Sequence, residues 1–442
     1  MINQPPSAMD RRTVRGLTCA GIALVLCVHA AGRIGAYCSP LRNDSYIYAS
    51  FGYRIAQGDV LYRDMSDIKP PGLFLLYAMN YLVLPPGRPS LVPVESLFLI
   101  AAYYAVYRIA RDFYGPAIGV CASIIAAVTL NYFTVMGYVI EGFGLAENFM
   151  VLPAVAAIGF YMNGRSTGRS TPFVLAGVLL AWDAALKQSA VAVIAAVGIH
   201  QAAWAVFVER SVRKWAKHAA LIAAGAILGA LPFIVLLLMQ GTFRTALELL
   251  TRDAGAMIAR GTAWPATLAD IRPLALPLAW CGWALVDALG WTIRRTREPS
   301  GPNSQSDRGN RPTDASFVGL LLIWCLCEAS LIALLPLRSA HYYVAACPPF
   351  ILLTGSALHR FSLAGRSLSP PARCAASSIA LVISAALYRP VINESMPVAL
   401  SRWKSHDAAA DRRRFDDAVN AGRIHFGRGA PFVEPDPNPL TD

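Results

Sequence analysis

Charged side chains gather in residues 43–72, directly after the first long apolar stretch of the sequence. Both flanks of this segment are apolar enough for hydrocarbon, and a carboxylate beside a bilayer is costly to desolvate. Clustered charges in such a place are therefore more often functional than decorative. The charged residues of the segment are Asp44, Arg54, Asp59, Arg63, Asp64, Asp67 and Lys69.

Lys69 is the cation with the clearest chemical use, because Pro70 and Pro71 follow it directly. Two prolines restrict φ and force an extended chain just before a short apolar segment. The ammonium is thereby held at the boundary between water and lipid. Two interpretations stay open. Lys69 is either a lysine that contacts lipid head groups, or a point charge that binds the phosphate of a lipid-linked molecule.

Asp44 precedes a segment, residues 45–57, that is expected to form a helix on the membrane surface. Ile47, Phe51 and Ile55 recur there at helical spacing and give the helix one apolar face. By spacing alone, an N-cap is the favoured role for Asp44. A chemical role for this carboxylate needs support from outside the local pattern.

The composition is that of a membrane protein. Of the 442 residues, 55% are hydrophobic and only 15% are charged, whereas soluble domains are about a quarter charged. Several apolar stretches of about 18–22 residues are long enough to cross a hydrocarbon core about 30 Å thick. The net charge of +12 does not indicate nucleic-acid binding, because the basic residues lie in short loops between apolar stretches.

We therefore predict an all-α polytopic membrane protein with about eleven transmembrane helices. Residues 16–33 could mimic a signal peptide, but a first span fits a chain whose remainder is also membrane-embedded. Residues 72–84 are ambiguous, because about thirteen residues reach only about 20 Å as a helix and suit an interfacial or re-entrant helix. The predicted spans are 16–36, 91–109, 115–135, 148–163, 172–187, 189–208, 218–239, 273–293, 317–336, 342–359 and 374–391.

Charge decides whether residues 72–84 cross the membrane. If they do not, the basic loops between the spans all share the side of the N-terminus, as the positive-inside rule requires. If they do, every one of those loops moves to the other side. We therefore predict a cytoplasmic N-terminus and an exterior C-terminus. The exterior segments are then 37–90, 136–147, 240–272, 337–341 and the tail from about 392.

Further polar side chains fall at the ends of the predicted spans. Glu147 stands at the start of one span, where capping the helix is its simplest role. Lys187 follows Asp183 by four residues, which predicts an i, i+4 ion pair, with a second phosphate contact as the alternative. For His341 and the tyrosines after it, the alternative to a chemical role is an interfacial aromatic belt.

Residues 43–72 resemble the first exterior loop of the GT-C membrane glycosyltransferases that use polyprenyl-phosphate sugars. That group includes the protein O-mannosyltransferases and the lipid A aminoarabinose transferase. In the family an Asp follows the first span, then a stretch similar to G-x-x-x-Y-R-D…K-P-P. An acidic residue recurs in the second exterior loop, and H-Y-Y precedes a late Pro-containing span. The matching residues are Asp44, Gly58, Tyr62, Arg63, Asp64, Lys69, Pro70, Pro71, Glu141, Glu147, His341, Tyr342, Tyr343, Pro348 and Pro349.

The resemblance covers residues 16–210 well and the remainder loosely. It implies a GT-C-like fold with helical exterior loops, in which residues 1–210 form a transmembrane module that includes the first exterior loop. Residues 211–391 would supply the C-terminal transmembrane helices, and 392–442 a short exterior tail. The implied location is the bacterial inner membrane, with the active site on the periplasmic side.

The implied activity is transfer of a sugar, with inversion, from a polyprenyl-phosphate donor to a lipid, glycan or protein acceptor. Asp44 would be the general base, and Lys69 would bind the departing phosphate. Glu141 or Glu147 would hold the acceptor or a divalent cation; no other cofactor is implied. Arg338 and His341 would contact the donor phosphate or sugar. Further candidates are Asp64, Asp67 and Tyr342.

The competing interpretation is a transporter or flippase of lipid-linked saccharide. Such a protein is expected to carry ionisable or helix-breaking residues near the midplane of several spans. The sequence offers His29, Asp287 and Glu328, which form no obvious set. The transferase interpretation is therefore the preferred one.

Overall fold

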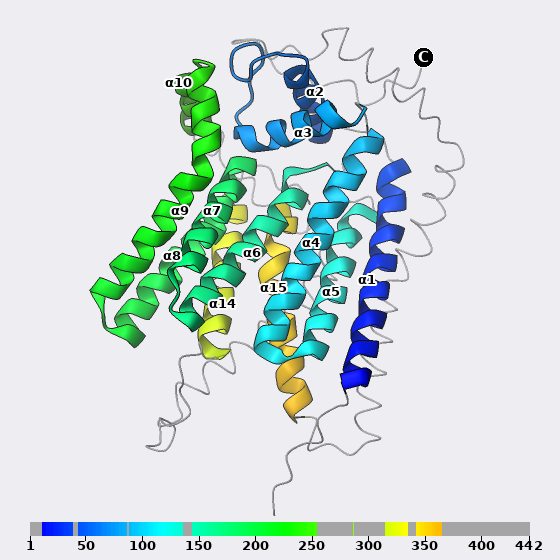
Figure 1. The fold of residues 1–442 in the computed structure, drawn as a ribbon, viewed down its shortest axis with the longest axis vertical. Helices are drawn as coiled ribbons and strands as arrows, with labels where there is room; N and C mark the ends of the chain where they lie inside the picture. Colours follow the sequence, from blue (N-terminus) through cyan, green and yellow to red (C-terminus); the bar gives the residue numbers. More distant parts are fainter. Residues whose placement is uncertain are drawn as a thin grey trace, which may run out of the picture.

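The computed structural model of the chain describes residues 11–38, 43–85, 88–135, 144–253, 314–334 and 342–364, together with the single residue 286. This part of the chain is helical and contains no named β-strand. Figure 1 shows long helices side by side, with two shorter helices, α2 and α3, at one end. The main elements are α1 (Arg11–Cys38), α2 (Asn43–Ala56), α3 (Pro71–Val83), α4 (Arg88–Tyr114), α5 (Pro116–Val135), α6 (Ala146–Thr167), α7 (Ser170–Leu186), α8 (Val191–Trp204), α9 (Val212–Met239), α10 (Phe243–Glu248), α14 (Asp314–Leu334) and α15 (Tyr342–Ala364).

Several of these helices are built to cross a membrane. Four segments are long and apolar enough by length and composition: Ser90–Tyr114, Gln188–Glu209, Val212–Met239 and Ser316–Leu334. Shorter apolar stretches lie within α1, α3, α5 and α7. The chain is therefore an integral membrane protein of the all-α class, as predicted. The predicted spans 273–293 and 374–391 lie outside the described residues, so the total of eleven stays a prediction.

The ambiguous segment 72–84 does not cross the bundle. It forms α3, which lies across one end of the long helices and packs against α2 (Figure 1). Pro70 is the N-cap residue of α3, with φ −64° and ψ 160°, so the extended conformation expected before the helix is present. The surface helix expected over 45–57 is α2. We call this end of the molecule, with α2, α3 and the connector between them, the α2–α3 end.

A second group of basic residues lies at the opposite end. The turns between α4 and α5, between α6 and α7, and between α8 and α9 all fall there (Figure 1). The alternating helix directions thus separate the loops as the charge pattern predicted. We call this the basic end; its described cations are Arg108, Arg111, Arg165, Arg169, Arg210, Arg213, Lys214 and Lys217.

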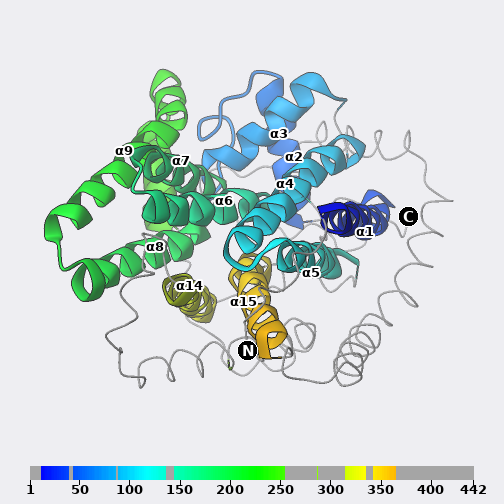
Figure 2. The ribbon, with the colours of Figure 1, turned by 60° about the horizontal axis from the view of Figure 1, so that its bottom comes forward.

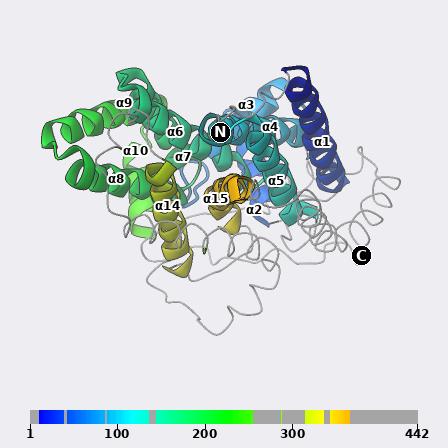
Figure 3. The ribbon, with the colours of Figure 1, turned by 90° about the horizontal axis from the view of Figure 1, so that it is seen from below.

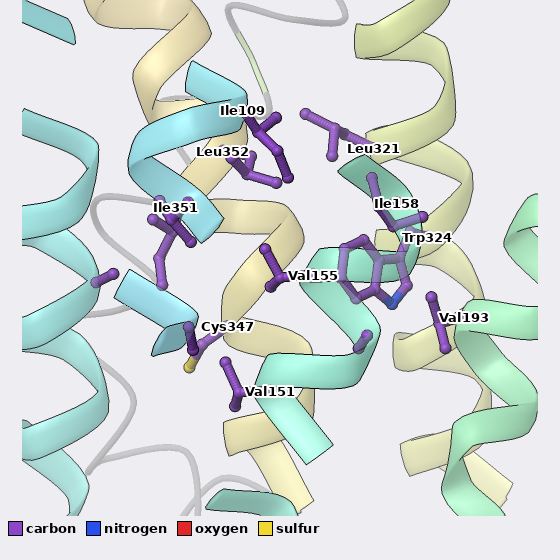
Figure 4. Packing of buried hydrophobic residues seen from close by; sticks show 14 of the residues in the cluster. Ile109, Val151, Val155, Ile158, Val193, Leu321, Trp324, Cys347, Ile351 and Leu352 are labelled. Carbon is purple, nitrogen blue, oxygen red and sulfur yellow. The ribbon is translucent and has the colours of Figure 1, made fainter. Parts of the chain in front are cut away.

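Helix α6 lies in the middle of the bundle and contacts α4, α7 and α15 (Figures 2 and 3). Its inward side chains pack with those of α4, α8, α14 and α15 around the fully buried Trp324 (Figure 4). This packing sets the direction in which the first turn of α6 emerges at the α2–α3 end. The labelled core residues are Ile109, Val151, Val155, Ile158, Val193, Leu321, Trp324, Cys347, Ile351 and Leu352.

Helices α7 and α9 approach each other closely because small residues face across their interface. A Cβ atom on Gly177 would lie 2.0 Å from the Ile222 carbonyl oxygen, and one on Gly225 would lie 2.0 Å from that of Val174. Such contacts replace the hydrophobic driving force that is missing between helices in lipid. They also fix where the C-terminal end of α7, and hence Lys187, is placed.

Candidate active site

Packing of α2 on α3 brings the two ends of the charged segment together. Tyr48 and Phe51 of α2 are buried against Phe74 of α3, with ring centroids 5.8 and 5.2 Å apart. The helices touch at Gly52, where a Cβ atom would lie 2.3 Å from Cβ of Tyr77. Asp44 lies in the first turn of α2 and not at the N-cap position that its spacing favours. Its carboxylate instead faces Lys69, at the end of the connector.

The connector 57–70 is a hydrogen-bonded loop. Asp64 accepts a hydrogen bond from the Val60 amide at 2.7 Å and pairs with Arg63 at 3.0 Å. The Arg63 hydrogen bond, followed by that of the Val60 amide, lowers the pKa of Asp64 to about 2. Asp59 similarly pairs with Arg54 at 2.6 Å. Asp64, a further candidate from the sequence, therefore shapes the loop, and its carboxylate contacts none of the lysines of the site.

Lys69 is the centre of a compact charge cluster. Its Nζ lies 3.3 Å from Oδ2 of Asp44, 3.9 Å from Oδ1 of Asp67, and 4.9 Å from the ring centroid of Tyr48. The Tyr48 hydroxyl donates a hydrogen bond of 2.9 Å to Asp44. Burial by itself would lower the pKa of Lys69, but the carboxylates of Asp67 and Asp44 outweigh it and raise the pKa above its ordinary value. The ammonium is therefore charged at neutral pH.

A second ion pair adjoins the first. Glu147, in the first turn of α6, forms a buried salt bridge with Lys187 at the end of α7, and Nζ of Lys187 lies 4.4 Å from the ring centroid of Tyr342. Burial and then the charges of Asp44 and Glu147 raise the pKa of Tyr48, while Tyr342 interacts electrostatically with Lys69. The two lysines and their carboxylates therefore form one site, which joins α2, the connector, α6, α7 and α15.

The predicted ion pair between Asp183 and Lys187 is wrong. Lys187 is the C-cap residue of α7, with φ −161° and ψ 146°, so its side chain leaves the helix surface that Asp183 occupies. Asp183 is only 1% exposed, and neither carboxylate oxygen accepts a hydrogen bond within the described residues. Lys187 instead reaches the α2–α3 end.

A buried polar network beneath the site escaped the sequence analysis. Glu95 of α4, with no exposed surface, forms a salt bridge with Arg33 of α1. Its other oxygen accepts hydrogen bonds from the Gly144 amide at 2.8 Å and from the Asn148 side chain at 2.5 Å. Arg33 also donates to Asn131 of α5, at 2.9 and 3.1 Å. The sequence carried a signal for this ion pair, because Arg33 and Glu95 are side chains of opposite charge inside two predicted spans.

This network positions the first turn of α6. Gly144 is held from two sides, since its amide donates to Glu95 and its carbonyl accepts a hydrogen bond from the Tyr77 hydroxyl of α3. Gly144 has φ +74°, and a Cβ atom there would lie 2.6 Å from the Tyr77 hydroxyl oxygen. The chain thus enters α6 at a fixed place, three residues before Glu147.

Other predicted site residues lie outside the described part of the chain: Glu141, Arg338 and His341. Within the described part, no three His, Cys, Asp or Glu side chains are grouped to hold a metal ion. Three carboxylates belong to the candidate site: Asp44, Asp67 and Glu147. Each of them contacts a lysine ammonium. In this arrangement the three carboxylates pair with lysine side chains of the protein. The divalent cation expected from the sequence stays a prediction.

Comparison with known proteins identifies the fold. No protein-family model and no curated protein matches the sequence. A solved structure of ArnT from Cupriavidus metallidurans bound to undecaprenyl phosphate matches with a TM-score of 0.58 and 16% identity, over 92% of this chain and 69% of that chain. The archaeal oligosaccharyltransferase AglB from Archaeoglobus fulgidus, in complex with an inhibitory peptide and a dolichol-phosphate, matches with a TM-score of 0.50 and 15% identity, over 94% of this chain and 61% of that chain.

The protein therefore has the GT-C fold, which the resemblance of residues 43–72 predicted. At 15–16% identity the likeness establishes the arrangement of helices and leaves the reaction to be argued from the site. This chain covers less than two thirds of the AglB chain. Both similar structures are of proteins held with a lipid phosphate.

Proposed function

We propose that this protein is an inverting glycosyltransferase that moves a sugar from a polyprenyl-phosphate-linked donor to a lipid, glycan or protein acceptor. The observation that carries the proposal is the pairing of Asp44 with Lys69 at the end of the bundle, 3.3 Å apart. A fold shared with a structure bound to undecaprenyl phosphate supports it. If the basic end faces the cytoplasm, as the positive-inside rule expects, the reaction takes place on the exterior face of the bacterial inner membrane.

In the proposed reaction, an acceptor hydroxyl attacks the anomeric carbon of the donor sugar from the face opposite the phosphate. The bond from the anomeric carbon to the phosphate oxygen breaks, and the polyprenyl phosphate leaves with the electron pair. Asp44 takes the proton of the attacking hydroxyl, and the ammonium of Lys69 balances the charge that develops on the phosphate. Attack from the opposite face inverts the configuration of the sugar.

Binding of the donor requires the Asp44–Lys69 pair to exchange partners. A base and a phosphate contact on opposite faces of one carbon atom cannot remain in contact with each other. The phosphate therefore replaces Asp44 beside Lys69, while Asp67, whose carboxylate also accepts a hydrogen bond of 3.0 Å from the Lys69 amide, keeps the lysine in place. Asp44 is then available to the acceptor.

The neighbouring ion pair supplies the remaining proposed contacts. We propose that Glu147 orients the acceptor and that Lys187 is a second cation for the donor phosphate. The ring of Tyr342 lies against Lys187 and so forms one wall beside this cation. Arg338 and His341 are proposed as further donor contacts on sequence grounds.

The test compares cell-envelope glycans by mass spectrometry in cells that carry the gene, lack it, or express Asp44→Asn. We expect one glycosidic modification to depend on the gene, and Asp44→Asn to lower it at least about a hundredfold, because a positioned base contributes 10²–10⁴ in rate. Asp59→Asn, which removes a carboxylate of the same loop, is the matched control and should retain the modification. Near-normal modification by Asp44→Asn contradicts the assignment of the base. Unchanged linkages with accumulated lipid-linked saccharide in the deletion would favour a flippase.

A further inference from the structure

A cavity of about 410 Å³ lies between α8 and α9 at the basic end, on the opposite side of the molecule from the candidate active site. Ala205 and Val206 form one wall, and Val212 and Trp215 form the other. Arg210 and Ser211 close it where the two helices connect. Figure 2 shows this connection at the rim of the bundle, away from α4, α5 and α15.

The chain that joins the two helices has an irregular backbone where it borders the cavity. After Trp204 the chain makes a π-helical turn, η2 (Ala205–Glu209), which is wider than an α-helical turn and is often found at functional sites. Arg210 then adopts a left-handed conformation, with φ 48° and ψ 38°, which is uncommon for a residue other than glycine. Ser211 caps α9 by accepting a hydrogen bond from the Lys214 amide. This connection leads the chain from α8 back into α9 at the basic end.

The walls of the cavity suit a hydrocarbon chain. Val206 is 64% exposed, Val212 is 78% exposed and Trp215 is 39% exposed, although all three are large and apolar. In a helix that faces the bilayer, such side chains meet lipid, and a tryptophan at this depth is typical of the membrane–water interface. An acyl chain that entered the wedge would cover them.

Arg210 lines the cavity, and three further cations, Arg213, Lys214 and Lys217, follow it in the first two turns of α9. Within the described residues, Arg210, Arg213, Lys214 and Lys217 take part in no ion pair with a carboxylate. The nearest acid in sequence, Glu209, is engaged by Arg165 at 3.4 Å. A cluster of basic residues at the cytoplasmic surface of a bundle is a typical binding site for anionic lipid head groups.

We propose that the cavity between α8 and α9 binds one acyl chain of an anionic phospholipid, whose phosphate is held by Arg210 and Lys214. The apolar walls select a lipid over a soluble anion, and the unbalanced cations select an anionic lipid over a zwitterionic one. The proposal concerns the basic end and is independent of the sugar-transfer reaction at the α2–α3 end. A failure of either proposal leaves the other unaffected.

The experiment uses the full-length protein, purified in detergent and delipidated, and native mass spectrometry. Dioleoyl phosphatidylglycerol and dioleoyl phosphatidylcholine are the two probes. We expect one phosphatidylglycerol to be retained at concentrations where phosphatidylcholine is lost. The double variant Arg210→Gln/Lys214→Gln should weaken that binding about tenfold or more, since each basic side chain near an anionic lipid contributes about fivefold in affinity.

Two further variants make the result specific. Arg108→Gln/Arg111→Gln removes two cations from the last turns of α4, at the same end but away from α8 and α9 (Figure 2), and should leave phosphatidylglycerol binding unchanged. Ala202→Leu adds apolar bulk at the cavity wall without changing the charge, and should weaken binding. The proposal is overturned if the two lipids bind equally, if both double variants lose the same affinity, or if Ala202→Leu binds as well as the natural protein.

Discussion

Asp44 and Lys69 are 25 positions apart in sequence and meet because α2 folds back on α3. Neither side chain is fully buried: Asp44 is 31% exposed and Lys69 is 15% exposed. An ion pair at such a partly exposed place contributes little net stability, about 1 kcal/mol or less. It can therefore be exchanged for a phosphate, which forms stronger charge-assisted hydrogen bonds with an ammonium.

At the residue scale, Lys69→Ala should weaken the binding of undecaprenyl phosphate to the purified protein about tenfold or more. The reason is that a hydrogen bond to a charged group contributes about 1.5–3 kcal/mol. The measurement is a titration followed by the shift in thermal unfolding. Arg108→Ala near the end of α4, which also removes one exposed cation but lies away from both proposed sites, is the control. Equal binding by Lys69→Ala would remove this residue from the phosphate site.

The pH dependence of undecaprenyl phosphate binding is a second measurement on Lys69, because it reports whether this side chain is protonated. Because the pKa of Lys69 is raised above its ordinary value, the stabilisation from its ion pairs is fully present below the ordinary lysine pKa of about 10.4. It is lost only as the pH rises through the raised pKa. Binding of the phosphate should accordingly not decline between about pH 7 and 9 through loss of this charge.

At the scale of elements, the Arg33–Glu95 pair ties the helices that surround the site. Arg33 comes from α1, Glu95 from α4, Asn131 from α5 and Asn148 from α6, and all four side chains are buried. Two charges removed from water are stable only if each remaining hydrogen-bonding atom finds a partner. The network meets this condition around Glu95, whose two oxygens receive three partners.

Removal of one charge from this network should be strongly destabilising. Glu95→Gln keeps the shape of the side chain but leaves Arg33 buried without a counter-charge, which typically costs about 3–5 kcal/mol. The measurement is denaturant unfolding of the purified protein. The double variant Arg33→Met/Glu95→Gln removes both charges and should recover part of the loss. If Glu95→Gln unfolds at the same denaturant concentration as the natural protein, the pair does not hold the helices.

At the scale of the whole molecule, the two ends differ in charge and in proposed role. The basic end carries cations in short turns, while the α2–α3 end carries the carboxylates of the candidate active site together with its two lysines. The positive-inside rule assigns the basic end to the cytoplasm. The proposed sugar transfer would then take place on the exterior face, and the proposed lipid site would open to the cytoplasmic leaflet.

This orientation can be measured with a thiol reagent that does not cross membranes. Arg63→Cys, at an exposed position of the connector, should react in intact spheroplasts. Arg213→Cys, exposed in the first turn of α9, should react only after the membrane is permeabilised. The natural protein gives the background from its own cysteines. The opposite pattern of labelling would invert the molecule and contradict an exterior site.

The sequence by itself determined the class of the protein, the approximate positions of its long described helices and the placement of residues 72–84 at one end. These properties depend on local quantities: the length of an apolar stretch, its periodicity, and the sign of the charges beside it. Asp44 and Lys69 were also predictable as a pair of interest, because they lie in one short charged segment that resembles the GT-C loop.

Only the tertiary structure decided which side chains meet across helices. Lys187 pairs with Glu147 and not with Asp183, because the conformation of a single cap residue turns it out of α7. Arg33 finds Glu95 because α1 and α4 are rotated toward each other, and the cavity at the basic end lies where the π-turn and Arg210 lead from α8 into α9. Helix rotation and cap geometry are set by packing over the whole bundle, so no local pattern reveals them.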